Sequence, residues 1–116
     1  MESRPSILID MRKHRIRIHK TTLQAIGSPD FVMLIVNPKK HTLGIQSSML
    51  DDKLALRIRK NTIRKDCELY SKPLMAALHE LCPDWDDRES YRMEGKIIAD
   101  EGMAVFSMKD FSVLEH

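Results

Sequence analysis

The sequence predicts an α+β domain that is rich in strands. Apolar and polar residues alternate strictly over 15–19, which is typical of a half-buried strand. The run over 31–36 is continuously apolar and partly β-branched, which favours another strand. Apolar residues over 74–81 recur at i, i+3, i+4 and i+7, the period of one helix face. Because 116 residues fill one ordinary domain, we expect a single compact unit over 1–113.

The first half, residues 1–47, is expected to hold four strands and one short helix. The strands are predicted at 6–10, 15–19, 31–36 and 42–46. A capping box over 21–24 predicts the start of the helix, and Gly27 predicts its end because glycine tolerates positive φ. The apolar run predicts a central strand that is covered on both faces.

The second half, residues 54–113, is expected to repeat this order of elements. Strands are predicted at 54–59, 67–70, 91–99 and 103–108, the last two forming a hairpin around 100–102. Ser71 is the predicted N-cap of a helix that has Pro73 in its first turn and ends at Pro83.

The two halves align with an offset of 51 residues, which pairs Leu23 with Leu74 and Ala25 with Ala76. A β-α-β-β unit of roughly 40 residues is too small to bury its own apolar face well. Two tandem units packed as a pseudo-dimer are therefore the favoured arrangement, and an unrelated α+β arrangement is the alternative.

Charge is divided unequally along the chain. Residues 1–65 hold 14 Lys and Arg against 5 Asp and Glu, a net charge of +9, whereas residues 66–116 carry −7. Two segments, 12–20 and 57–65, each hold five basic residues and no acid. Such clusters favour a polyanion such as nucleic acid. The alternative is that they are solvated strand faces whose charges pair with the acidic second half.

The stretch from Arg15 to Gly27, RIRIHKTTLQAIG, resembles the AbrB, MazE and SpoVT family of swapped-hairpin regulators. Ile18-His19-Lys20 stands at the family's Ile-Pro-Lys step, Ile26-Gly27 at its Leu-Gly end, and residues up to Ile45 supply the hairpin. The resemblance covers 15–45. Family members usually pair two chains, and the internal repeat offers both halves in one chain.

What the resemblance implies is binding of double-stranded DNA by basic residues near the first strand. The second half offers a corresponding basic set by position. The ten candidate residues are Arg12, Lys13, Arg15, Arg17, Lys20, Arg57, Arg59, Lys60, Arg64 and Lys65. The predicted function is that of a small, non-enzymatic DNA-binding regulator or accessory protein. A protein–protein interaction module without nucleic-acid binding is the alternative, and a homodimer is left open.

No set of residues predicts catalysis, a cofactor or a metal site. His79 and Cys82 are three apart in the predicted helix, but two ligands do not make a metal site, and the favoured interpretation is a surface histidine beside a buried cysteine. With only two cysteines, no disulfide framework is expected, which suits a reducing cytoplasm. No apolar run reaches 18 residues, so no membrane span is predicted. Residues 114–116 are interpreted as a remnant of a purification tag.

Overall fold

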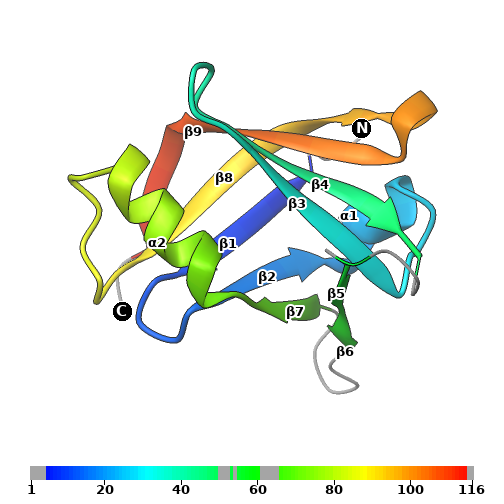
Figure 1. Cartoon of the computed structure of the whole chain (residues 1–116), viewed down its shortest axis with the longest axis horizontal. Coiled ribbons are helices and arrows are strands. Elements are labelled where there is room, and N and C mark those ends of the chain that lie inside the picture. Colours follow the sequence, from blue (N-terminus) through cyan, green and yellow to red (C-terminus); the bar gives the residue numbers. More distant parts are fainter. Residues whose placement is uncertain (1–4, 50–52, 54, 61–65, 115–116) are drawn as a thin grey trace.

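The computed structural model describes residues 5–49, 53, 55–60 and 66–114 and confirms the strand-rich α+β class (Figure 1). The described strands are β1 (Ser6–Asp10), β2 (Arg15–His19), β3 (Phe31–Asn37), β4 (Thr42–Ser48), β5 (Leu56–Arg57), β6 (Arg59–Lys60), β7 (Asp66–Tyr70), β8 (Ser90–Ile98) and β9 (Met103–Leu114). The helices are α1 (Lys20–Ala25) and α2 (Lys72–Leu81), and a 3₁₀ turn spans Ala99–Glu101.

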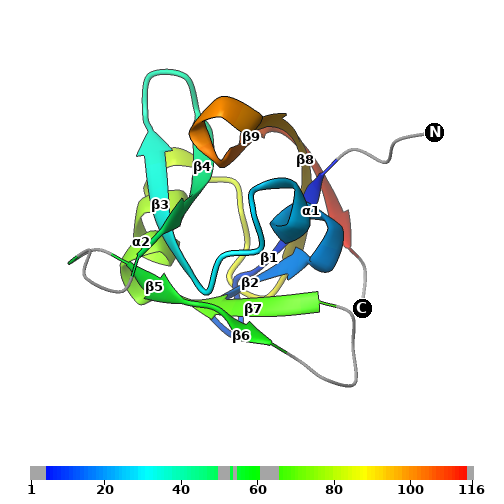
Figure 2. The same ribbon diagram turned by 90° about the vertical axis from the view of Figure 1, so that its right-hand side faces the viewer.

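All the described strands belong to one antiparallel sheet, in the order β5-β3-β4-β9-β8-β1-β2-β7-β6. Strands β5 and β6 stand at opposite ends of this order, yet only Ile58 separates them in the chain. The segment over 56–60 therefore joins the two edges, because its first part pairs with β3 and its last part with β7. As a result the sheet curls into a near-barrel (Figure 2).

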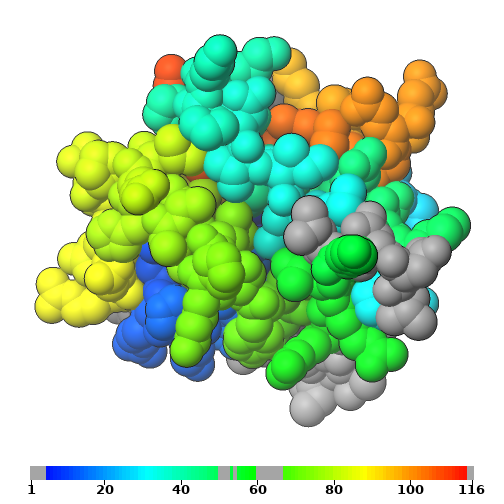
Figure 3. Space-filling view, viewed as in Figure 1, coloured from blue at the N-terminus to red at the C-terminus, as the bar shows by residue number. Residues whose placement is uncertain are grey.

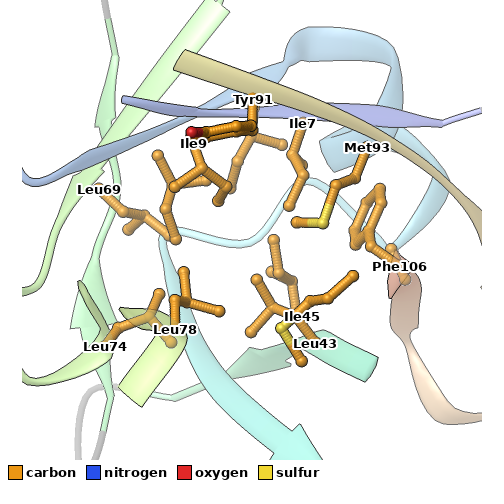
Figure 4. Packing of buried hydrophobic residues seen from close by; sticks show 14 of the residues in the cluster. Ile7, Ile9, Leu43, Ile45, Leu69, Leu74, Leu78, Tyr91, Met93 and Phe106 are labelled. Atoms are coloured by element: carbon orange, nitrogen blue, oxygen red, sulfur yellow. The ribbon is translucent and has the colours of Figure 1, made fainter. Parts of the chain in front are cut away.

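The core fills the inside of this curled sheet, and the helices lie at its two ends. Helix α1 is at one end and α2 at the other in Figure 1, and in Figure 2, turned by 90°, α1 lies in front of α2. Leu23 of α1 and Leu74 and Leu78 of α2 are buried. Figure 4 shows Leu74 and Leu78 facing side chains from several strands across the interior. Those labelled strand residues are Ile7, Ile9, Leu43, Ile45, Leu69, Tyr91, Met93 and Phe106.

The two hairpins of the first half do not pair with each other. The β1–β2 hairpin lies between β8 and β7, and the β3–β4 hairpin lies between β5 and β9. Each of them is therefore held in the sheet by strands of the second half.

Helix α1 begins earlier than the capping box predicts, and that prediction is wrong. The N-cap is His19, whose Nδ1 accepts a hydrogen bond from the Thr21 backbone N–H at 3.2 Å. The helix follows β2 directly, so the last outward side chain of the strand is in place to cap it. The predicted end is confirmed, since Ile26 is the C-cap and Gly27 has a φ of +98°.

Strand β3 is not covered on both faces, so that prediction is also wrong. Only Val32 is fully buried, and Ile35 is 41% exposed. A sheet that curls around one core has a single inner face, and the outer face of β3 meets solvent. A continuous apolar run does not distinguish a strand with one buried face from a central strand that is covered on both faces.

Strand β9 is longer than predicted and carries an irregularity. It continues to Leu114, which pairs with Ser90. Leu114 therefore belongs to the sheet, contrary to its interpretation as part of a tag remnant. Glu115 and His116 lie outside the described residues. The register shifts between Met93 and Gly95 of β8. There Phe106 packs so closely that a Cβ at Gly95 would lie 2.6 Å from its ring.

Candidate nucleic-acid interface

The two basic segments, 12–20 and 57–65, meet across β7. Strand β2 comes from the first segment and β6 from the second, and both pair with β7. In this register Glu68 is opposite Arg17 on one side and opposite Arg59 on the other. Two strand spacings separate the backbones of Arg17 and Arg59 by about 10 Å. Strands β2, β7 and β6 lie along the lower side in Figures 1 and 2.

Alternation along these strands directs the basic side chains outward. Ile16 and Ile18 of β2 are fully buried, and Ile58 between β5 and β6 is buried. The intervening residues Arg15, Arg17, Arg57 and Arg59 therefore point away from the core. We call the outer surface of β2, β7 and β6, together with Arg57 and Lys20 at its border, the basic face.

The structure separates the predicted site residues by exposure. Arg12 and Lys13 are exposed in the turn between β1 and β2, Lys20 is exposed at the start of α1, and Arg57 and Arg59 are exposed on β5 and β6; Arg15 and Arg17 are partly buried. The backbone of Lys60 lies in β6. Arg64 and Lys65 lie outside the described residues.

Arg15 and Arg17 are both engaged by carboxylates. Arg15 Nε lies 3.1 Å from Asp10 Oδ2, and its Nη1 lies 3.2 Å from Glu68 Oε1. Arg17 Nε lies 3.6 Å from the same Glu68 oxygen. The alternative interpretation, that basic charges pair with acids of the second half, therefore holds for these two residues. Ion pairing reduces the positive charge that they offer to a ligand.

The exposed arginines lie over aromatic rings. The guanidinium carbon of Arg59 is 5.0 Å from the ring centroid of Tyr70, and that of Arg57 is 5.7 Å from the centroid of Phe31. Within the described part of the chain, neither arginine forms an ion pair. Neither basic segment contains an aromatic residue, so sequence inspection missed these contacts, which come from β7 and β3. An arginine over a ring is held in place while its charge remains available.

An acidic loop follows α2 and adjoins the turn that carries Arg12 and Lys13. The backbone N–H of Met11 donates to the carbonyl of Glu89 at 3.2 Å, which places the loop against that turn. Figure 3 shows the loop, in yellow, close to the β1–β2 turn, in blue. Side-chain hydrogen bonding from Arg88 lowers the pKa of Asp86, so this carboxylate stays ionised. The basic residues that lie away from this acidic loop are therefore those towards β6 and α1.

Sequence reasoning missed Arg92, an exposed cation that lies in line with Arg17 across the sheet. Arg92 of β8 pairs with Leu8 of β1, and Leu8 pairs with Arg17 of β2. Arg92 also lines a groove of about 960 Å³ between β8 and β9, whose charged lining is mixed because Lys96 and Lys109 are accompanied by Glu94 and Asp110. The alternation of polar and apolar residues over 91–97 is the signal that could have placed Arg92 outward.

The structure places the remaining chemistry-bearing residues apart from one another. In the described ranges no group of three or more His, Cys, Asp and Glu side chains is arranged to hold a metal ion. His79 is exposed and lies 2.6 Å from Asp87, whereas Cys82 is buried, as expected. Burial raises the pKa of the Cys82 thiol, which disfavours the reactive thiolate. Neither described helix is long and apolar enough to span a membrane.

Comparison with family models, with curated proteins and with solved structures found no match to this chain.

Proposed function

We propose that the chain binds double-stranded DNA through the basic face, as a small non-enzymatic regulator or accessory protein. The observation that carries this proposal is the meeting of the two basic segments on either side of β7. It concentrates Arg17, Arg59, Arg57 and Lys20 on one side of a compact domain. Arginine and lysine on such a surface contact phosphates and release the counterions that surround DNA.

A protein–protein interaction module is the second candidate, and the acidic loop after α2 is the observation that favours it. Asp84 and Asp87 are exposed there, beside Glu89. A basic partner would bind this loop and leave the basic face unoccupied. The two candidates therefore predict different surfaces and different responses to DNA.

We also propose that the chain is a pseudo-dimer of swapped-hairpin-like halves, 1–47 and 54–113. The β2–β7 register supports it, because Arg17 pairs with Glu68, the residue 51 positions further along. This is the offset that aligns Leu23 with Leu74. Between the β3–β4 and β8–β9 hairpins the corresponding offset in residue number is 61, because Gly44 at the middle of the β4–β9 ladder pairs with Val105. The longer α2 and the loop after it account for eight of these ten residues, and β8, which is two residues longer than β3, accounts for the other two. Each hairpin pairs only with strands of the other half.

A pseudo-two-fold axis would then pass between Arg17 and Glu68. Two identical halves would place arginine opposite arginine there, and like charges directly opposite each other destabilise a sheet. Glutamate at position 68 makes this central contact attractive. The two halves would therefore be alike in element order and unlike in charge.

A salt titration with matched variants tests the DNA-binding proposal. The probe is a fluorescent random-sequence duplex, titrated at several salt concentrations. The site variant Arg57→Gln/Arg59→Gln removes two exposed cations of the basic face. The control Lys39→Gln/Lys40→Gln removes two exposed cations from the turn between β3 and β4. Both variants change the net charge equally and leave buried residues untouched.

We expect the wild-type chain to bind the duplex with an affinity that falls steeply as salt rises. The log–log slope should become shallower by about 0.9 for each lost phosphate contact in the site variant. The control should keep the wild-type slope. Absence of binding at low salt, or equal losses in both variants, would contradict the proposal and favour the protein-interaction candidate.

A further inference from the structure

We infer that the Glu68 carboxylate occupies the place of a DNA phosphate between Arg15 and Arg17, and that it thereby sets the affinity of the basic face. The inference rests on the proposed function, because it concerns the same surface. Glu68 is at the centre of that surface, since it is opposite both Arg17 and Arg59 in the sheet.

The contacts of Glu68 are those that a phosphate group would make. Oε1 lies 3.2 Å from Arg15 Nη1 and 3.6 Å from Arg17 Nε. Oε2 accepts a hydrogen bond from the Tyr70 hydroxyl at 2.9 Å. Two guanidinium groups and one hydroxyl thus converge on a single anion. A phosphodiester offers two non-bridging oxygens with the same charge and the same acceptor chemistry.

Arg17 has hydrogen-bonding capacity that Glu68 does not satisfy. Its Nε is buried and has no hydrogen-bond partner among the residues that the structure describes. The distance of 3.6 Å to Glu68 is too long for a good hydrogen bond. A buried donor without an acceptor is costly, so a closer acceptor at this position would be favourable.

Arg15 is compensated differently from Arg17. Arg15 Nε lies 3.1 Å from Asp10 Oδ2, so this arginine keeps a carboxylate partner if Glu68 moves away. Arg17 has no second carboxylate within the described part of the chain. Displacement of Glu68 by a phosphate would therefore make the positive charge of Arg17, more than that of Arg15, available to DNA.

Replacement of Glu68 by glutamine tests this inference because it should increase DNA binding, whereas loss of a supporting contact would decrease it. Glu68→Gln removes the competing charge and retains an oxygen for the Tyr70 hydroxyl. Glu80→Gln is the matched control, since Glu80 is exposed on α2 and the substitution changes the net charge equally. Both are titrated with the same random-sequence duplex over a range of salt concentrations.

We expect Glu68→Gln to bind the duplex about tenfold more tightly at low salt, with a slope steeper by about 0.9 for one gained phosphate contact. The Glu80→Gln control should change affinity by less than about twofold, because it lies outside the phosphate contacts. The double variant Glu68→Gln/Arg17→Gln should lose most of the gain. Glu68→Thr, which also removes the charge and introduces a residue that favours strands, should bind more tightly than the wild-type chain as well.

Equal affinities for Glu68→Gln and Glu80→Gln, or weaker binding by Glu68→Gln while its thermal unfolding is unchanged, would overturn the inference. If Glu68→Gln does not fold, the Glu68→Thr result decides: unchanged or weaker binding counts against a competing carboxylate. Failure of the proposed function has a different signature, namely that neither the wild-type chain nor any of these variants binds the duplex at low salt.

Discussion

Strands β2 and β7 pair along their whole lengths, and they are alike on the inner face and unlike on the outer face. The inner residues of both strands are buried and apolar: Ile16, Ile18, Cys67 and Leu69. On the outer face β2 presents two arginines, whereas β7 presents Glu68 and Tyr70. Packing therefore constrains one face of each strand, and the other face is free to carry the charge on which the proposed binding of DNA depends.

Truncation of the inner face should have the largest effect on stability. Ile18 is completely buried and Leu69 is 1% exposed, so each fills core volume that neighbouring side chains cannot easily recover. We expect Ile18→Ala and Leu69→Ala each to lower the free energy of unfolding by about 2–5 kcal/mol. Urea denaturation followed by circular dichroism measures both values. A loss below about 1 kcal/mol for only one of them would show that the inner faces are not equivalent.

The hairpins β3–β4 and β8–β9 should differ in their tolerance of a methyl group. A Cβ at Gly95 of β8 would lie 2.3 Å from the Val105 carbonyl oxygen and 2.6 Å from the Phe106 ring. At Gly44 of β4 the nearest atom would be the Met103 sulfur at 3.2 Å, the end of a flexible side chain. We expect Gly95→Ala to cost about 1–3 kcal/mol by overpacking.

Gly44→Ala serves as the control, and its unfolding free energy should stay within about 1 kcal/mol of wild type because the thioether can shift. Equal losses of unfolding free energy in the two glycine variants would mean that the irregular part of β8–β9 accommodates a methyl group as readily as the regular β3–β4 ladder.

The sequence predicts local periodicity well and pairing between distant strands poorly. Alternation over 15–19 and the helix period over 74–81 identify β2 and α2, because each depends on neighbours within a few residues. The same two patterns also predict which side chains of β2 and α2 face the core. The start of α1 was missed because His19 is both the last strand residue and the cap.

The basic segments were predicted from composition, but their meeting on the two sides of β7 was not. That juxtaposition depends on the register of β2 with β7 and on the return of the chain through Ile58. Both are long-range features that no local pattern encodes. For the same reason the sequence did not identify Glu68 as the partner of Arg15 and Arg17, or Tyr70 as the ring beneath Arg59.

The Arg17–Glu68 contact should contribute little to stability despite its central place. The side chains are 23% and 15% exposed, and the two charged atoms are 3.6 Å apart. In a double-mutant cycle with Arg17→Gln and Glu68→Gln, we expect a coupling free energy of about 0.2–1 kcal/mol. Urea denaturation at low and high salt measures it, and salt should reduce it only in part. A coupling above about 2 kcal/mol would make Glu68 a structural residue and weaken its interpretation as a replaceable anion.

The Asp86–Arg88 pair provides the exposed counterpart of that contact, and its expected effect is the smallest. Hydrogen bonding from Arg88 lowers the pKa of Asp86 below the ordinary value of 3.8. The ionised form is thus favoured in the folded chain, so its contribution to stability is present above the unfolded pKa and is lost as pH falls through the folded value. In Arg88→Gln the pKa of Asp86 should rise towards 3.8, as measured by carboxyl NMR titration. The unfolding free energy near neutral pH should hardly change, because solvent screens a pair in which the Arg88 side chain is 84% exposed. An unchanged pKa would show that Asp86 is not held by Arg88, whereas a clear loss of stability would show that this exposed pair supports the fold more than the Arg17–Glu68 contact is expected to.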